Sequence, residues 1–127
     1  MVKKDYLMRL ISEMVRAVLK MLFNIDTDNP SSELLEDAEQ KQTLDQLLDM
    51  VNQGEINEAE NRIYEMTSDG SFDNLKIALL FYSDLNERSD TFLKEHDFSR
   101  DEIEFGMKEM VSRYGLDHIA ELFLRER

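Results

Sequence analysis

Two histidines are the residues of this sequence best suited to metal or acid–base chemistry. His96 stands between Glu95 and Asp97, and His118 comes one helical turn before Glu121. Because imidazole nitrogens and carboxylate oxygens are both zinc ligands, His96, His118 and Glu121 would form a zinc site if folding brought them together. Nothing in their spacing requires this, so we expect two surface histidines, with His96 near the end of a helix.

Other metal and catalytic motifs fail on spacing. A di-iron carboxylate bundle needs a glutamate three residues before a histidine on each of two helices, and those positions hold Leu93 and Gly115. A calcium loop starting at Asp26 needs glycine at its sixth position, which is Ser31. The chain has no cysteine, no phosphate-binding glycine loop and no H-E-x-x-H motif. We therefore predict a protein that is not an enzyme and that holds no cofactor and no metal.

The carboxylates are numerous, but their context predicts exposure. Asp101, Glu102 and Glu104 crowd the start of a predicted helix, where the helix dipole favours negative charge. An acid–base pair would require burial, and we expect these side chains in solvent. The alternative function is a small-ligand-binding protein or an enzyme that uses buried carboxylates. A cavity with two or more buried Asp or Glu residues would favour that alternative.

The composition predicts one acidic domain spanning residues 1–127. The chain has a formal net charge of −13 and 42% hydrophobic residues, enough for a core of ordinary size. Such a charge repels nucleic acid. The absence of cysteine suits a reducing compartment, and no window approaches the roughly 18 apolar residues of a membrane span. We expect a soluble, cytoplasmic protein that does not bind nucleic acid.

Apolar residues recur at helical spacing along the chain, and no segment alternates with the period of two that strands show. The sequence therefore predicts an all-α fold, a compact bundle of six or seven antiparallel helices without a β-sheet. The helices are expected over residues 5–24, 31–53, 56–67, 72–86, 90–95, 100–114 and 116–125.

Local signals set the ends of these helices. Asn29 followed by Pro30 resembles an N-cap with proline at the first helical position. Ser99 followed by Glu102 predicts a capping box at the start of the sixth helix. The helix ends are predicted from glycines that follow them, at Gly54, Gly70 and Gly115.

Gly106 and the fourth helix bear on the packing of the bundle. Gly106 lies inside a helical pattern, where we expect it to let another helix approach closely. The fourth helix has apolar residues on two faces, which favours a buried central helix. The alternative is a groove lined by Tyr82 and Tyr64 that accepts a peptide.

The first helix is unusual in both polarity and charge. Its polar residues form one narrow stripe, so most of its circumference is apolar, more than one neighbouring face can cover. Residues 1–25 also carry five basic and two acidic residues, although the chain as a whole is acidic. Three interpretations follow: the central helix of the bundle, the interface of a symmetric homodimer, or a membrane-surface adaptor. The candidate interface residues are Met8, Arg9, Ile11, Val15 and Arg16.

One helix hairpin resembles half of a tetratricopeptide repeat. Its residues 43–66 carry a glycine between two helices and a small residue on the second helix, with the matching positions at Gly54, Ile56, Ala59, Ile63 and Met66. Advancing Gly54 by the repeat period of about 34 residues reaches Arg88, so no second copy follows. The alternative is a generic helical hairpin with a small residue at the crossing point.

The N-terminal runs Asp5–Ile11 and Met14–Phe23 resemble the opening of an uncharacterised family of small all-helical proteins from Gram-positive bacteria. The resemblance implies a cytoplasmic helical protein without known activity, and it supplies no site residues. We therefore expect a non-enzymatic protein–protein interaction or scaffold module. It would self-associate through its N-terminal helix or bind another protein, as yet unknown.

Overall fold

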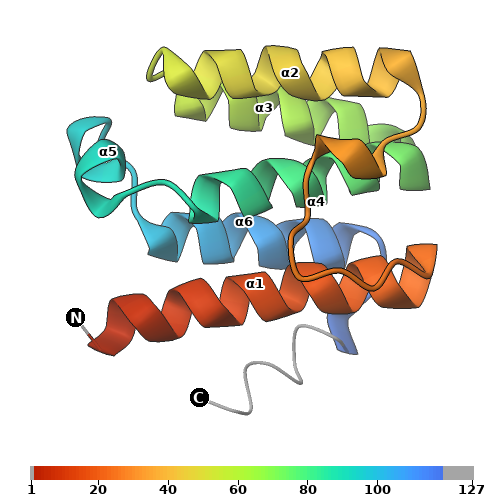
Figure 1. Ribbon diagram of the computed structural model, residues 1–127, viewed down its shortest axis with the longest axis horizontal. Helices are drawn as coiled ribbons and strands as arrows, with labels where there is room; N and C mark the ends of the chain where they lie inside the picture. The colour runs from red at the N-terminus through yellow and green to blue at the C-terminus, as the bar shows by residue number, and fades with distance from the viewer. Residues whose placement is uncertain (1, 119–127) are drawn as a thin grey trace.

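The computed structural model describes residues 2–118, with side chains from residue 5 onward. This part of the chain is helical and contains no strand, which confirms the all-α prediction (Figure 1). Residues 2–118 form six α-helices and two short 3₁₀ turns. In chain order the elements are α1 (Val2–Phe23), η1 (Ser32–Leu34), α2 (Ala38–Asn52), α3 (Ile56–Met66), η2 (Thr67–Asp69), α4 (Phe72–Asn86), α5 (Asp90–Glu95) and α6 (Arg100–Arg113).

Helix α4 lies at the centre of the bundle. It packs against α1 and α6 on one side and against α2 of the α2–α3 hairpin on the other (Figure 1). Phe23, Phe72 and Tyr114 meet at one end of the bundle, with ring centroids 6.5 and 6.0 Å apart. Because these residues lie at the end of α1, the start of α4 and just after α6, α1 and α6 run in one direction and α4 runs in the other.

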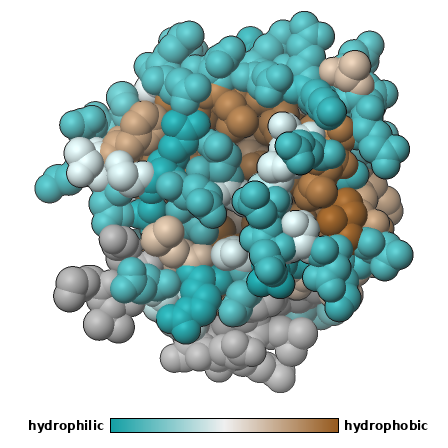
Figure 2. Space-filling view, in the orientation of Figure 1, coloured by the Kyte–Doolittle hydropathy of each residue, from teal (hydrophilic) through white to brown (hydrophobic). Residues whose placement is uncertain are grey.

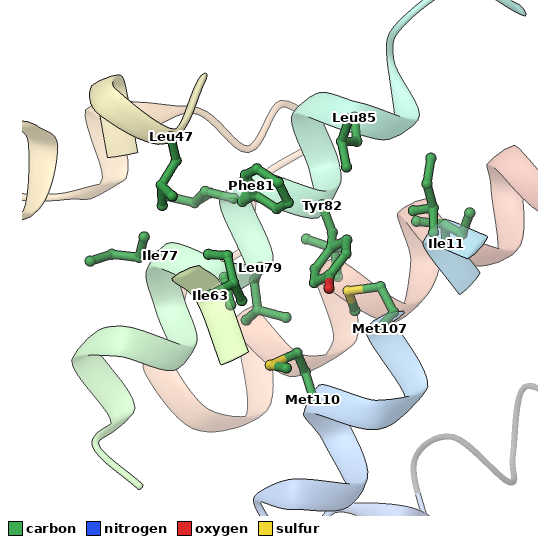
Figure 3. Close-up of a cluster of buried hydrophobic side chains, with 14 of the residues drawn as sticks. Ile11, Leu47, Ile63, Ile77, Leu79, Phe81, Tyr82, Leu85, Met107 and Met110 are labelled. Carbon is green, nitrogen blue, oxygen red and sulfur yellow. The ribbon is translucent and has the colours of Figure 1, made fainter. Parts of the chain in front are cut away.

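The core surrounds α4, of which nine of 15 residues are buried. Figure 3 shows Phe81 and Tyr82 of α4 among side chains from the other long helices. Tyr82 is fully buried, so it belongs to the core and not to an exposed groove. Both apolar faces of α4 therefore belong to the core, because helices pack against α4 on two sides.

The first helix is a core helix in this structure. Seven of its apolar side chains are at most 4% exposed: Leu7, Leu10, Ile11, Met14, Val15, Val18 and Leu19. Both α4 and α6 pack against α1, so its wide apolar surface is covered by two neighbours where the sequence argument considered one. The polar stripe, which includes Arg9 and Arg16, faces solvent.

The predicted second helix over residues 31–53 is wrong in its first third. Pro30 lies outside any helix, and Ser31 caps only the short turn η1. Leu35 then adopts an extended backbone and is fully buried. Asp37 caps the true start of α2 by accepting hydrogen bonds from the backbone nitrogens of residues 39 and 40. The predicted helix is interrupted here because the extended Leu35 places its side chain in the core.

The remaining local signals are confirmed where the structure describes them. Ser99 and Glu102 form a capping box at the start of α6. Gly54, Gly70 and Gly115 adopt left-handed backbone angles directly after helical segments, with φ of 87°, 73° and 74°. The predicted last helix falls mostly beyond residue 118, outside the described residues. Within residues 2–118, no helix combines the length and apolar character needed to cross a membrane.

Candidate interaction site

An open pocket of about 830 Å³ lies at the end of the bundle where α1 and α6 begin and where α5 packs. Three apolar side chains, Leu7, Leu93 and Phe98, contribute to it and are almost fully buried, so they form its floor. Charged and polar residues form the rim: Asp90, Lys94, Asp97, Ser99, Arg100, Asp101 and Glu102. An apolar floor inside a polar rim is the usual composition of a protein interface.

Helix α5 forms one wall of the pocket and is held in place by contacts with the α2–α3 turn. The ring of His96 stacks edge-on against Phe92, with centroids 4.7 Å apart. The same imidazole packs on Gly54, where an added Cβ would lie 2.6 Å from ring atoms. Arg88 lies over the Phe92 ring and donates a 2.7 Å hydrogen bond to Asn52. These contacts fix α5 against the α2–α3 turn, so the sequence expectation of two surface histidines fails for the packed His96.

The turn from α5 to α6 brings Phe98 into the pocket. Asp97 adopts a left-handed backbone with φ of 55°, a conformation that Asp tolerates better than most residues. The Phe98 nitrogen then donates to the Leu93 carbonyl oxygen at 2.9 Å. Immediately afterwards the Ser99–Glu102 capping box starts α6. The turn therefore places an apolar floor residue directly beside charged rim residues.

Arg100 links three elements beneath this rim. Its side chain is 7% exposed and forms an ion pair with Asp90, at the start of α5. It also donates hydrogen bonds to the carbonyl oxygens of Asn86 and Arg88, at the end of α4. A cation there stabilises the negative end of the α4 dipole and satisfies its last carbonyls. The Arg100 Nε is buried without a hydrogen-bond partner among the described residues.

The structure does not bring the five predicted interface residues together on one exposed surface. Ile11 and Val15 are fully buried by this chain's own helices, so they form core instead of an available face. Arg16 is exposed and pairs with Asp28 at 2.9 Å. Arg9 lines a separate hollow of about 150 Å³. Met8 is half-buried, and its carbonyl oxygen accepts a 2.9 Å hydrogen bond from Asn86.

The pocket was missed by the sequence reasoning, although one signal pointed to it. Arg100 sits in the first turn of α6, where the helix dipole disfavours a cation. A basic residue at that position therefore indicates a partner elsewhere, which proves to be the end of α4. The floor residues gave no separate signal, because Leu7 and Leu93 fit a core helix equally well.

Carboxylate burial was also predicted incorrectly at one position. Glu104 is 5% exposed and pairs with Lys108 at 3.2 Å, although Asp101 and Glu102 are exposed as expected. The reason is register, because Glu104 lies four residues after Arg100 on the inner side of α6. His118 is exposed, and Glu121 of the conceivable zinc set lies outside the described residues. The described part of the chain contains no cluster of potential metal ligands.

A second polar site lies where α3, α4 and α6 meet. The Tyr82 hydroxyl donates a 2.7 Å hydrogen bond to Glu60 Oε2. Burial raises the pKa of Glu60 above its ordinary value of 4.5, while the Tyr82 hydrogen bond opposes that shift and the nearby charge of Glu102 adds to it. Burial and the neighbouring Glu60 likewise raise the pKa of Tyr82. Neither Glu60 nor Glu104 is among the described residues that line the pocket.

Comparison with known families covers nearly all of this fold. The family described as a family of unknown function (DUF6483) matches residues 1–115. The chain belongs to the DUF6483 family. The match includes every described helix and all of the pocket-lining residues. No curated protein and no solved structure is significantly similar to this DUF6483 member. The Gram-positive origin and the tetratricopeptide-like half-repeat stay predictions, although the α2–α3 hairpin itself is present.

Proposed function

We propose that this DUF6483 protein is a non-enzymatic protein–protein interaction module, and that its pocket beside α5 holds a segment of a partner protein. The observation that carries the proposal is the open pocket with its apolar floor and charged rim. Small-molecule sites bury roughly 70–90% of their ligand. An opening this wide is better suited to side chains projecting from a larger partner.

The chemistry of the lining residues supports a binding role. Ser99 is the sole hydroxyl residue among the described lining residues. Its hydroxyl accepts from the Glu102 backbone nitrogen and donates to the Glu102 carboxylate, so it serves the helix cap. The described lining residues include no histidine that could act as its base. The rival proposal of an enzyme with buried carboxylates would need residues from elsewhere in the protein.

Selection from a displayed random peptide library tests the proposed function. The intact protein is the bait, and bound peptides are re-tested against Lys94→Trp, which adds a bulky side chain at the pocket wall. Lys41→Trp on α2 is the matched control, since Lys41 is also exposed and is not one of the described lining residues. We expect peptides whose binding is lost in Lys94→Trp and kept in Lys41→Trp. Peptides that bind both variants equally, or an empty selection, would overturn the proposal.

Self-association through α1 is a second form of the same proposal. Burial of Ile11 and Val15 restricts such an interface to the exposed stripe, which includes Arg9 and Arg16. Sedimentation equilibrium at tens of micromolar tests it directly. A dimer that dissociates in Arg9→Glu/Arg16→Glu but persists in Lys41→Glu would support it, and a strict monomer would remove it.

A further inference from the structure

We propose that the segment bound by this pocket is basic and apolar: one aliphatic or aromatic side chain flanked by lysine or arginine. This inference rests on the proposed function and adds the chemistry of the partner. It follows from the combination of an apolar floor, an acidic rim and a buried arginine at one place in the fold. Each of these features selects a different part of the bound segment.

The rim selects the charge of the segment. Among the described residues that line the pocket, four are carboxylates and two are basic, Lys94 and Arg100. The charges of Arg100 and Asp90 offset each other in an ion pair, so the formal negative excess comes from Asp97, Asp101 and Glu102 against Lys94. The chain also carries a formal net charge of −13, which adds a long-range attraction for cations. Lysine or arginine beside the rim is therefore favoured, whereas an acidic segment is repelled.

The floor selects an apolar anchor. Leu7, Leu93 and Phe98 come from three different parts of the chain, and all line the same opening. An inserted aliphatic or aromatic side chain would remove further apolar surface from water on both partners. Charge without an anchor would give only weak, salt-sensitive attraction. Anchor and flanking charge are therefore both required.

Arg100 selects an acceptor from the backbone of the segment. Buried N–H groups without a partner are uncommon in folded proteins, and the Arg100 Nε is one of them within the described residues. Arg100 is also a lining residue of the pocket, so a shift of its side chain on binding would offer this N–H to a carbonyl oxygen of the bound segment. Because every residue has a backbone carbonyl, this contact does not depend on the sequence of the segment. Specificity comes from the apolar anchor and the flanking charges.

Titration of the ¹⁵N-labelled intact protein with three synthetic nonapeptides tests the inference by NMR. The first probe is Gly-Ser-Lys-Lys-Leu-Lys-Lys-Ser-Gly with blocked ends. The second replaces the central leucine by serine, and the third replaces all lysines by glutamate. We expect the first probe to shift the amides of Leu93, Phe98 and Arg100 at the pocket. The serine and glutamate probes should bind about tenfold more weakly or not at all.

Charge variants locate the effect at the rim. Asp97→Asn/Asp101→Asn should weaken the first probe about three- to tenfold, and Lys94→Glu should tighten it. Asp45→Asn/Asp49→Asn on exposed positions of α2 makes the same change in net charge away from the pocket, and it should leave binding within about twofold. Asparagine is also well tolerated at the left-handed position 97.

The outcomes separate this inference from the proposed function. Equal binding of the leucine and serine probes, or equal weakening in the rim and α2 variants, would mean non-specific attraction and would overturn the inference. If the library selects pocket-dependent peptides that lack basic residues, the interaction module stands and only the partner chemistry fails. If nothing binds in a pocket-dependent way, both fail.

Discussion

Gly106 allows three helices to meet at the Tyr82–Glu60 hydrogen bond. A Cβ at this position would lie 2.6 Å from the Tyr82 hydroxyl and 2.7 Å from Glu60 Oε2. The position therefore confirms the sequence expectation that Gly106 permits a close approach. Any larger residue has to displace the hydroxyl from its acceptor or push α6 away from α3 and α4.

Gly106→Ala should destabilise the fold by about 1–3 kcal/mol, the usual cost of overpacking. This is the reverse of its intrinsic effect, since alanine favours a helix interior by about 1 kcal/mol. Urea unfolding followed by circular dichroism measures the difference. Ser112→Ala, at an exposed position of the same helix, is the control and should change stability little. A Gly106→Ala protein as stable as the parent would show that the helices are less tightly packed there.

Glu60 gives stability a pH dependence of defined sign. Because burial raises the pKa of Glu60 above 4.5, the folded state binds this proton more tightly than the unfolded state does. Ionisation of Glu60 therefore lowers stability as the pH rises from about its unfolded pKa through its folded pKa. Below that window the carboxyl is neutral in both states and this loss is absent.

Glu60→Gln should remove that loss, because glutamine stays neutral and still offers an oxygen to the Tyr82 hydroxyl. We expect the variant and the parent to be equally stable near pH 4, and the variant to be the more stable at pH 7. Urea unfolding at several pH values measures the difference in the free energy of unfolding between the variant and the parent. Glu58→Gln, an exposed neighbour on α3, controls for the change in net charge. If this difference became smaller as the pH rises, the raised pKa assigned to Glu60 would be wrong.

At the scale of elements, helices with local end signals were predictable and those positioned by distant contacts were not. The bounds of α4 and α5 match the prediction, and their starts are set by the neighbouring N-cap residues Ser71 and Ser89. The start of α2 was misplaced, because the break at Leu35 is imposed by burial in the core. The same holds for the pocket, whose walls come from residues far apart in the sequence.

Arg100 ties the end of α4 to the starts of α5 and α6, so its fork of donors matters more than its charge. Arg100→Lys keeps the charge but cannot reach Asp90 and two carbonyl oxygens together. We expect a loss of about 1–3 kcal/mol in stability. Faster amide hydrogen exchange in α5 than in α3 should accompany it. Arg62→Lys, at an exposed position of α3, should show neither effect.

At the scale of the whole molecule, the sequence identified α1 as unusual but could not say what covers it. The apolar side chains of Ile11 and Val15 are removed from water equally well in a core and in a dimer interface, so the two arrangements predict the same sequence pattern. The choice depends on where α4 and α6 pack, which local sequence does not specify. The two cases differ in energetics, because a core residue stabilises the monomer itself, whereas an interface residue stabilises only the assembly.

Ile11→Ala should therefore destabilise the protein by about 2–5 kcal/mol, the cost of emptying a fully buried site. The loss should be independent of protein concentration, because the contacts are made within one chain. Arg9→Ala, on the exposed stripe, should be nearly neutral. A midpoint of unfolding that rises with concentration in the parent would instead indicate that association contributes to stability.

Net charge couples the stability of the molecule to the binding proposed for its pocket. At −13 the folded state repels itself, and salt screens that repulsion, since the Debye length falls from about 30 Å at 0.01 M to about 10 Å at 0.1 M. We expect urea unfolding to show a more stable protein as NaCl is raised over this range.

Attraction of a basic segment to the rim is screened by the same ions, so the affinity of the pocket for that segment should fall over the same range. The two responses have opposite signs, so weaker binding at higher salt cannot be attributed to unfolding. Stability that falls together with affinity would contradict the role assigned to the acidic surface.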